Sequence, residues 1–171
     1  MKHYKLIIFD CDGTLTTTKS GATFRKSADD WQWLPSRLEK LHELKERDVL
    51  TAIATDQGGV AYGYMTEEAI TKEIDAVALE TRGYRAICFT HPKATIERYK
   101  REDDRRKPGG GMITEIMRWY AVGSGRPQTL SDVIVNQEDV LYVGDRPEDE
   151  QAAQAAACDF MWADEFFKQE N

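Results

Sequence analysis

The stretch Leu6–Thr16, which reads LIIFDCDGTLT, decides the fold of this chain. Its first four residues are apolar and include two isoleucines, as expected of a buried strand. Asp10 and Asp12 follow at once, with a single residue between them. Two carboxylates so close together repel each other, and a bound cation or a phosphate site accounts for such a pair. The stretch therefore predicts a strand that carries a ligand site at its carboxyl end.

The composition is that of a globular protein with one domain over residues 1–171. Hydrophobic residues make up 41% and charged residues 31% of the chain, and no apolar run approaches the roughly 20 residues of a membrane span. The net charge of −7 gives no support to general nucleic-acid binding, although it allows a local basic groove.

Cysteine usage and the start of the chain predict a cytoplasmic protein. The three cysteines are far apart and odd in number, which favours a reducing compartment over a disulfide framework. The opening run MKHYKLIIFD has a short apolar part that ends in acid, unlike a signal peptide.

Apolar periodicity predicts alternating strands and helices. Leucines at helical spacing indicate one helix, and an amphipathic run opened by Thr66 and closed by Gly83 indicates another. We expect strands at 5–9, 49–55, 84–89, 139–145 and at the start of 159–167, and helices at 34–48, 66–83, 147–157 and in the later part of 105–123. This order predicts an α/β fold, a Rossmann-like, doubly wound parallel sheet with right-handed crossovers and helices on both faces.

Polar side chains recur where the predicted strands end. Asp10 follows the first strand, Thr55 closes the second and Asp145 closes the fourth. Ligands of such sheets bind beyond the carboxyl ends of the strands, so we expect these residues to lie close together.

Four motifs in order resemble those of the haloacid dehalogenase-like (HAD) phosphohydrolases. They are D-x-D-G-T at 10–14, a hydroxyl at a strand end at Thr55, a lysine before Pro-Gly at Lys107, and G-D-x-x-x-D at 144–149. The match spans nearly the whole chain. The resemblance implies the HAD fold without a cap or with a minimal one, because the segments between the motifs leave no room for a further domain.

The resemblance implies a Mg²⁺-dependent phosphomonoesterase. Asp10 and Asp145 would hold the ion together with the backbone carbonyl of Asp12, and Asp149 would orient these ligands. Asp10 would also attack phosphorus and form an aspartyl-phosphate. Asp12 would protonate the leaving alcohol and then deprotonate the water that hydrolyses the intermediate.

Three further residues are implied to bind the transferring phosphoryl group. Thr55 and Lys107 would contact its oxygens, and Gly13 would let the backbone turn close to it. Each motif alone has an ordinary interpretation: a tight turn, a strand residue, a solvated lysine, or acids at a helix N-terminus. Four ordered matches favour the catalytic interpretation.

The segment 14–34 resembles the 3′-phosphatase domain of polynucleotide kinase-phosphatases. It reads TLTTTKSGATFRKSADDWQWL, with Thr-Lys-Ser-Gly, a phenylalanine and Asp-Trp in the order of that branch. Lys19 and Arg25 would then contact backbone phosphates, and Trp31 would stack on a terminal base. The alternative is that Trp31 and Trp33 anchor the following helix to the sheet. Removal of 3′-phosphates from polynucleotide ends is the leading interpretation.

The alternative substrate is a small metabolite, of the sugar bisphosphate or histidinol-phosphate type. The run DQGGV, which begins at Asp56 where asparagine is usual, resembles the N-Q-x-G-I segment of those phosphatases. Cys88 and His91 resemble half of their zinc loop, but Asp103 and Arg105 stand at the other two ligand positions. We therefore expect no structural zinc.

Two other functions are compatible with the motifs. A phosphotransferase would share every one of them. A binding module that has lost catalysis would lack the nucleophile or the acid, whereas Asp10 and Asp12 are both present. The expected partner is a phosphorylated substrate and not a membrane, and the sequence carries no signal for an oligomeric state.

Overall fold

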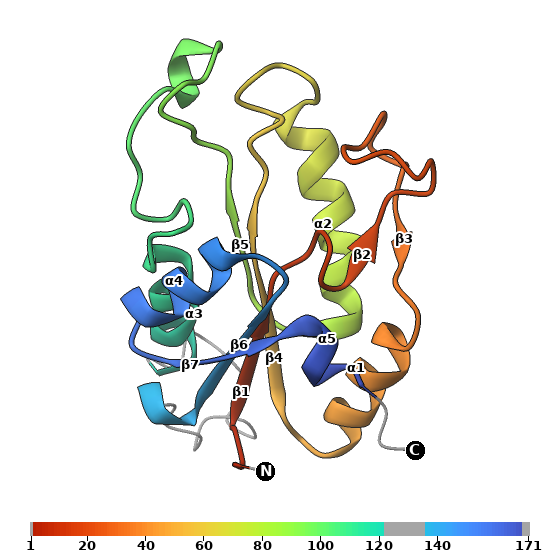
Figure 1. The fold of residues 1–171 in the computed structure, drawn as a ribbon, viewed down its shortest axis with the longest axis vertical. Helices are drawn as coiled ribbons and strands as arrows, with labels where there is room; N and C mark the ends of the chain where they lie inside the picture. Colours follow the sequence, from red (N-terminus) through yellow and green to blue (C-terminus); the bar gives the residue numbers. More distant parts are fainter. Residues whose placement is uncertain (1, 122–135, 169–171) are drawn as a thin grey trace.

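The computed structural model describes residues 2–121 and 136–168, and its centre is a five-stranded parallel sheet (Figure 1). The strand order is β5-β4-β1-β6-β7. The strands are β1 (Leu6–Phe9), β4 (Leu50–Asp56), β5 (Arg85–Cys88), β6 (Val140–Gly144) and β7 (Asp159–Trp162). The predicted parallel sheet is confirmed. The crossovers leave β1 toward opposite edges, which makes the carboxyl end of β1 the switch point where such folds bind ligands.

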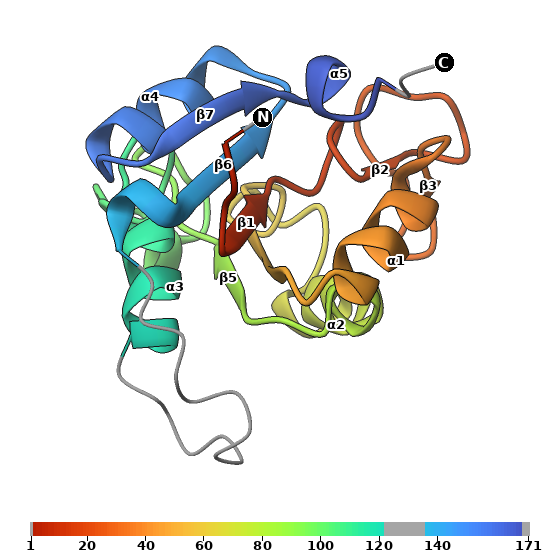
Figure 2. The same cartoon turned by 90° about the horizontal axis from the view of Figure 1, so that it is seen from below.

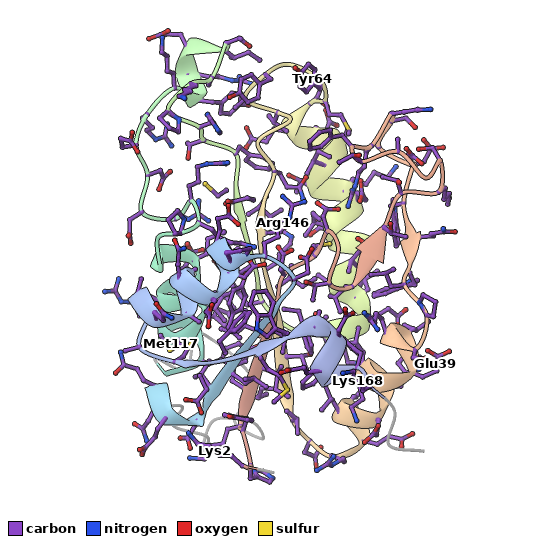
Figure 3. All side chains as sticks on the ribbon, in the orientation of Figure 1. Lys2, Glu39, Tyr64, Met117, Arg146 and Lys168 are labelled. Carbon is purple, nitrogen blue, oxygen red and sulfur yellow. The ribbon has the colours of Figure 1, made fainter. Side chains whose placement is uncertain are left out.

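Helices cover both faces of the sheet, as predicted, and Figure 2 shows the two layers. The first layer holds α1 (Arg37–Glu46) and α2 (Glu67–Thr81), and the second holds α3 (Gly111–Ala121) and α4 (Pro147–Ala155). Glu39 on α1 and Met117 on α3 accordingly lie on opposite sides in Figure 3. The short elements are α5 (Ala163–Phe166) and the 3₁₀ turns Glu97–Tyr99 and Gln137–Asp139. Positions 122 and 123 of the predicted third helix lie outside the described residues. In the described part of the chain, no helix has the length and apolarity to span a bilayer.

Alternate residues of β1 face the two helical layers. Ile7 and Phe9 pack in the core shared with α1 and α2, whereas Leu6 and Ile8 pack in the core shared with α3 and α4. All four side chains are buried. A strand covered on both faces needs apolar residues at every position, which explains the uninterrupted run LIIF.

The ends of α2 follow from three residues. Thr66 accepts a hydrogen bond from the backbone N–H of Ala69 at 3.1 Å and so caps the first turn. Arg82 adopts a left-handed conformation, with φ of 50°, and ends the helix. A Cβ atom at Gly83 would lie 1.6 Å from the carbonyl oxygen of Thr51, so only glycine fits where the chain turns back to the sheet.

A small antiparallel hairpin follows β1, which the apolar pattern does not predict. Its strands β2 (Thr16–Thr17) and β3 (Gln32–Trp33) pair with each other and stand apart from the main sheet (Figure 1). Strands of two residues are too short for an alternating pattern. Between the first and second motifs, the hairpin and its connection are thus the only additions to α1 and β4, and they form a minimal cap.

The connection between β2 and β3 is organised by the buried Asp30. Its carboxylate accepts hydrogen bonds from the backbone N–H and the hydroxyl of Ser20, at 2.8 and 2.7 Å, and from the backbone N–H of Lys26 at 3.0 Å. The side chain therefore closes the loop on itself. Part of the run that resembles the polynucleotide branch consequently has a structural role.

Candidate active site

The register of the central strands brings the predicted residues to one edge of the sheet. Phe9 at the end of β1 pairs with Ile53 in β4 and with Val143 in β6. Asp10 and Asp145 each come directly after their strand, so they leave neighbouring strands close together. The structure thus brings Asp10 and Asp145 to the edge where the sequence places them, and their roles stay a prediction.

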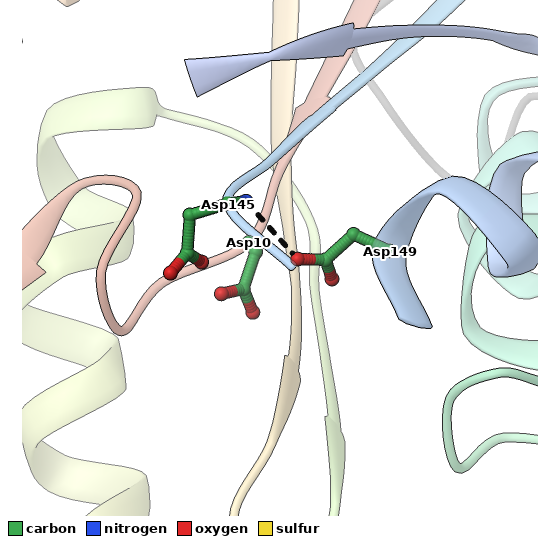
Figure 4. A group of neighbouring side chains, drawn as sticks. All are labelled: Asp10, Asp145 and Asp149. Atoms are coloured by element: carbon green, nitrogen blue, oxygen red, sulfur yellow. Dashed lines mark hydrogen bonds between the residues drawn. The ribbon is translucent and has the colours of Figure 1, made fainter. Parts of the chain in front are cut away.

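Three carboxyl groups gather there, as Figure 4 shows. One oxygen from each of Asp10, Asp145 and Asp149 lies within 4.8 Å of the other two. Asp10 and Asp149 are buried, whereas the side chain of Asp145 is 29% exposed. The cluster therefore opens to solvent on the side of Asp145.

Asp149 is held by four donors. Its Oδ2 atom accepts hydrogen bonds from the backbone N–H groups of Asp145 (Figure 4, dashed) and Arg146, at 3.1 and 3.0 Å. Its Oδ1 atom accepts from the Tyr142 hydroxyl at 3.1 Å and from Lys107 Nζ at 2.7 Å. These contacts use the lone pairs of the carboxylate, so Asp149 is suited to orienting its neighbours.

Lys107 lies between two of the acids. Its Nζ atom is 2.5 Å from Asp10 Oδ1 and 2.7 Å from Asp149 Oδ1, and its side chain is only 7% exposed. Burial alone would lower the pKa of Lys107, but the neighbouring acids raise it well above its ordinary value. Burial raises the pKa of Asp10 to about 7, and Lys107 opposes this shift.

The Asp12 carboxylate is held at both oxygens. Gln57 Nε2 donates to its Oδ2 at 2.7 Å, and the Arg25 guanidinium pairs with its Oδ1. Gln57 Nε2 also lies 3.0 Å from the hydroxyl oxygen of the buried Thr55. The Asp12 side chain is nevertheless 38% exposed, so a substrate group can reach it from solvent.

Gly13 gives the first motif its close turn. Its φ is 88°, and a Cβ atom there would lie 2.3 Å from Asp145 Oδ2. Any side chain would therefore intrude on the carboxylate cluster. The N–H of Gly13 donates to the Thr16 carbonyl at 2.8 Å. The structure thus shows Gly13 shaping the backbone beside Asp145, and a contact of Gly13 with phosphate stays a prediction.

The donor set fits a magnesium ion. Asp10 and Asp145 offer carboxylate oxygens at the open side of the cluster, and the Thr14 hydroxyl fixes Asp145 by donating to its Oδ1 at 3.2 Å. Hard oxygen ligands without nitrogen or sulfur are those that Mg²⁺ prefers. Asp10 and Asp145 are the residues that would hold the ion, and coordination by the Asp12 carbonyl stays a prediction.

The three residues predicted to bind a nucleic acid have different surroundings. Lys19 is exposed on the connection between β2 and β3. The Arg25 side chain is only 6% exposed and is paired with two carboxylates. Trp31 packs edge to face on Trp33, with 6.1 Å between ring centroids, and both are partly buried against the α1–α2 core. The packing interpretation of the tryptophans is the one these contacts favour.

Sequence reasoning missed three residues that hold the site. Gln57 donates a hydrogen bond to Asp12. Its polar side chain just beyond β4 is a sequence feature that points to a place at this edge of the sheet. Glu73 lies on the apolar stripe of α2 between Ile70 and Val77, and a charge on such a stripe indicates a buried ion pair. Tyr142 lies in the apolar strand β6, and nothing in the surrounding sequence indicates that its hydroxyl group contacts Asp149.

The positions that resemble a zinc loop make hydrogen bonds to other groups. Cys88 Sγ lies 3.1 Å from the Thr90 hydroxyl, which donates to Asp103 Oδ2 at 2.9 Å. His91 Nδ1 lies 3.0 Å from the Tyr62 hydroxyl. Cys88 is buried at the end of β5, in line with a packing role.

A comparison with known protein families shows to which family the chain belongs. The family model described as polynucleotide kinase 3 phosphatase matches residues 5–171. The chain belongs to this family. Its fold, its four motifs and its relatives make it a HAD phosphohydrolase, that is, a phosphoric monoester hydrolase.

Relatives of this HAD phosphatase are similar along most of their length. The D-glycero-beta-D-manno-heptose-1,7-bisphosphate 7-phosphatase of Photorhabdus laumondii is 29% identical over 157 residues, which cover 88% of this chain and 74% of the relative. The D,D-heptose 1.7-bisphosphate phosphatase of B. bronchiseptica, solved with magnesium and phosphate, is 30% identical, with a TM-score of 0.66 and coverage of 91% and 78%. A HAD-like protein from Mesorhizobium loti has a TM-score of 0.68 at 19% identity, covers 91% and 70%, and supports the fold alone.

Burial of Asp10 predicts that the metal-free phosphatase loses stability as the pH rises. Its pKa is about 7 in the folded chain against an ordinary 3.8, so the folded state keeps a proton that the unfolded chain releases. This contribution to the free energy of unfolding is complete below the ordinary pKa and disappears as the pH rises through about 7. Urea unfolding in a chelator should therefore show lower stability near pH 8 than near pH 5, by about 1 kcal/mol or more. The variant Asp10→Asn should show a smaller difference, with the remainder coming from Asp56 and Asp145, whose pKa values burial also raises. An undiminished difference in the variant would contradict the assignment to Asp10.

Proposed function

We propose that residues 1–171 form one Mg²⁺-dependent phosphatase domain that hydrolyses small phosphate monoesters of the sugar bisphosphate type through an aspartyl-phosphate at Asp10. The observation that carries this proposal is the cluster of Asp10, Asp145, Asp149 and Lys107, with Asp12 at the same edge of the sheet. A bound Mg²⁺ would offset the negative charge of the phosphate oxygens and orient the ester.

The residues of the chain divide the chemistry among them. Asp10 is the nucleophile, and its carboxylate is held by Lys107, whose ammonium group also offsets charge on the transferring oxygens. The Thr55 hydroxyl adds a donor at the neighbouring strand end. Asp12 gives a proton to the leaving oxygen as the P–O bond breaks, and takes one from water in the second step. Asp149 keeps Lys107 in place.

A small substrate is supported by the surroundings of the residues that would contact a nucleic acid. The guanidinium group of Arg25 is already paired with the carboxylates of Asp12 and Glu73. Trp31 packs against Trp33. The net charge of −7 gives no general attraction for a polyanion. The heptose bisphosphate phosphatases among the relatives support the same substrate class.

A second candidate substrate is the 3′-phosphorylated end of a polynucleotide. The match to the polynucleotide kinase 3 phosphatase model favours it, as does the run at 14–34. Lys19 is exposed on that run, so its ammonium group is open to contact with a backbone phosphate.

A substrate panel separates the two candidates. We expect kcat/KM for a sugar bisphosphate to exceed that for a 3′-phosphorylated oligonucleotide by about tenfold or more. The 5′-phosphorylated oligonucleotide is the matched control for general phosphate-ester activity. Preference for the 3′-phosphorylated end, together with a steep loss of that activity as salt rises, would instead support the polynucleotide substrate, because contacts to several backbone phosphates release counterions.

The cysteines support the predicted cytoplasmic setting. All three are free thiols, with Cys11 and Cys88 buried and Cys158 partly buried. Free thiols persist in reducing compartments. The setting stays a prediction that localisation of the tagged protein would check.

A further inference from the structure

Arg25 is a buried arginine between two acids. Its NH2 group contacts Asp12 Oδ1 and its NH1 group contacts Glu73 Oε1. The side chains of Arg25 and Glu73 are 6% and 2% exposed, whereas that of Asp12 is 38% exposed. The guanidinium thus links an acid in the interior to the reactive acid at the open edge of the sheet.

The anchor of this link is a buried residue of a long helix. Glu73 lies in the middle of α2, on the stripe that packs into the core. An arginine fork has a fixed planar geometry and can bind two carboxylates at once, which a lysine cannot do as well. The position of Arg25 relative to α2 therefore fixes one oxygen of Asp12.

The other oxygen of Asp12 is fixed independently. It accepts from Gln57, which also contacts Thr55 at the end of β4. The carboxylate consequently has one defined orientation set from two elements. Burying a charged pair offers little stability compared with apolar packing, so a positioning role accounts for Arg25 and Glu73 better than stability does.

We propose that Arg25 is a positioning residue, anchored by Glu73, that aligns Asp12 for proton transfer to the leaving oxygen of the substrate. This inference rests on the proposed role of Asp12. As the P–O bond breaks, the proton passes from the Asp12 carboxyl group to the leaving oxygen, and the guanidinium stabilises the carboxylate that forms. Arg25 itself neither gains nor loses a proton and does not touch phosphorus.

The test compares two esters with different leaving groups. Ethyl phosphate needs its leaving oxygen protonated, whereas p-nitrophenyl phosphate releases a stabilised anion and needs little help. The value of kcat/KM reports the step in which this bond breaks. In Asp12→Asn, we expect the loss on ethyl phosphate to exceed that on p-nitrophenyl phosphate by about 100-fold.

Arg25 is tested by the double variant Arg25→Met/Glu73→Gln. The single change Arg25→Met would leave Glu73 buried and unpaired and could prevent folding, whereas the double variant removes both charges. We expect about a tenfold or greater loss on ethyl phosphate and less than about threefold on p-nitrophenyl phosphate. The single variant Arg25→Lys, which keeps a positive charge at this position, should lose less activity on ethyl phosphate than the double variant does. Arg47→Met, which makes the same change at a side chain 60% exposed on the far end of α1, should behave as wild type.

The outcomes separate the two proposals. An equal loss on both esters, or no loss on either, in the double variant would overturn the positioning role of Arg25. If Asp12→Asn still discriminates between the esters in that case, the role of Asp12 stands. If Asp12→Asn does not discriminate, the proposed proton donor is wrong and the inference about Arg25 is overturned with it.

Discussion

Replacing Asp10 with asparagine is expected to lower phosphate release by at least about 10⁴-fold, because the change removes the group that we propose attacks phosphorus. The amide has the shape of the carboxylate but is a poor nucleophile, and it no longer pairs as an anion with Lys107 at 2.5 Å. Release of p-nitrophenol in saturating Mg²⁺ would measure the loss. Thermal unfolding of the variant would establish that it is folded.

The matched control is Asp164→Asn. It makes the same chemical change at a side chain that is 95% exposed, so activity should stay at the wild-type level. If Asp10→Asn retained more than about one hundredth of the wild-type rate, the covalent route through Asp10 would have to be abandoned.

Lys107→Met is expected to damage both catalysis and folding. The change removes the cation that we propose offsets charge on the phosphoryl group, which should lower kcat/KM by about 10²–10³-fold. It also leaves the buried acids Asp10 and Asp149 without the ammonium group that pairs with both of them. Loss of one member of a buried ion pair typically costs about 3–5 kcal/mol, so we expect a fall of this order in the free energy of unfolding.

Urea unfolding in a chelator would measure that fall at neutral pH. Lys100→Met is the control, because Lys100 is exposed and lies in the same segment between β5 and α3. A folded Lys107→Met protein with wild-type stability would mean that Lys107 does not compensate the acids. Wild-type kcat/KM would mean that it does not serve the phosphoryl group.

The sequence predicted the elements and the edge where the acids meet because both depend on local signals. The run LIIF is apolar at every position, and Thr66 marks the start of α2 by a hydrogen bond within four residues. Parallel strands then bring their carboxyl ends together by geometry, so the sequence alone predicts that Asp10 and Asp145 lie close to each other.

The rest depends on contacts that no local pattern encodes. The pairing of Arg25 with Glu73 joins a loop to a helix far along the chain. From the sequence alone, Arg25 is expected to contact a backbone phosphate of the substrate instead. The hairpin of β2 and β3 has strands too short for periodicity. The role of Asp30 appears only once Ser20 and Lys26 are folded around it.

The two acids proposed to react with the substrate are linked to opposite layers of the molecule. Asp12 is linked through Arg25 to α2 on one face, whereas Asp10 is linked through Lys107 to Asp149 in α4 on the other. Mutations in α2 or in the loop that carries Arg25 therefore change contacts of Asp12, whereas mutations in α4 change contacts of Lys107 and through it those of Asp10. With the roles proposed for these acids, changes in α2 and its loop would adapt proton transfer to alcohols of different acidity, while the contacts of Asp10, Lys107 and Asp149 stay the same.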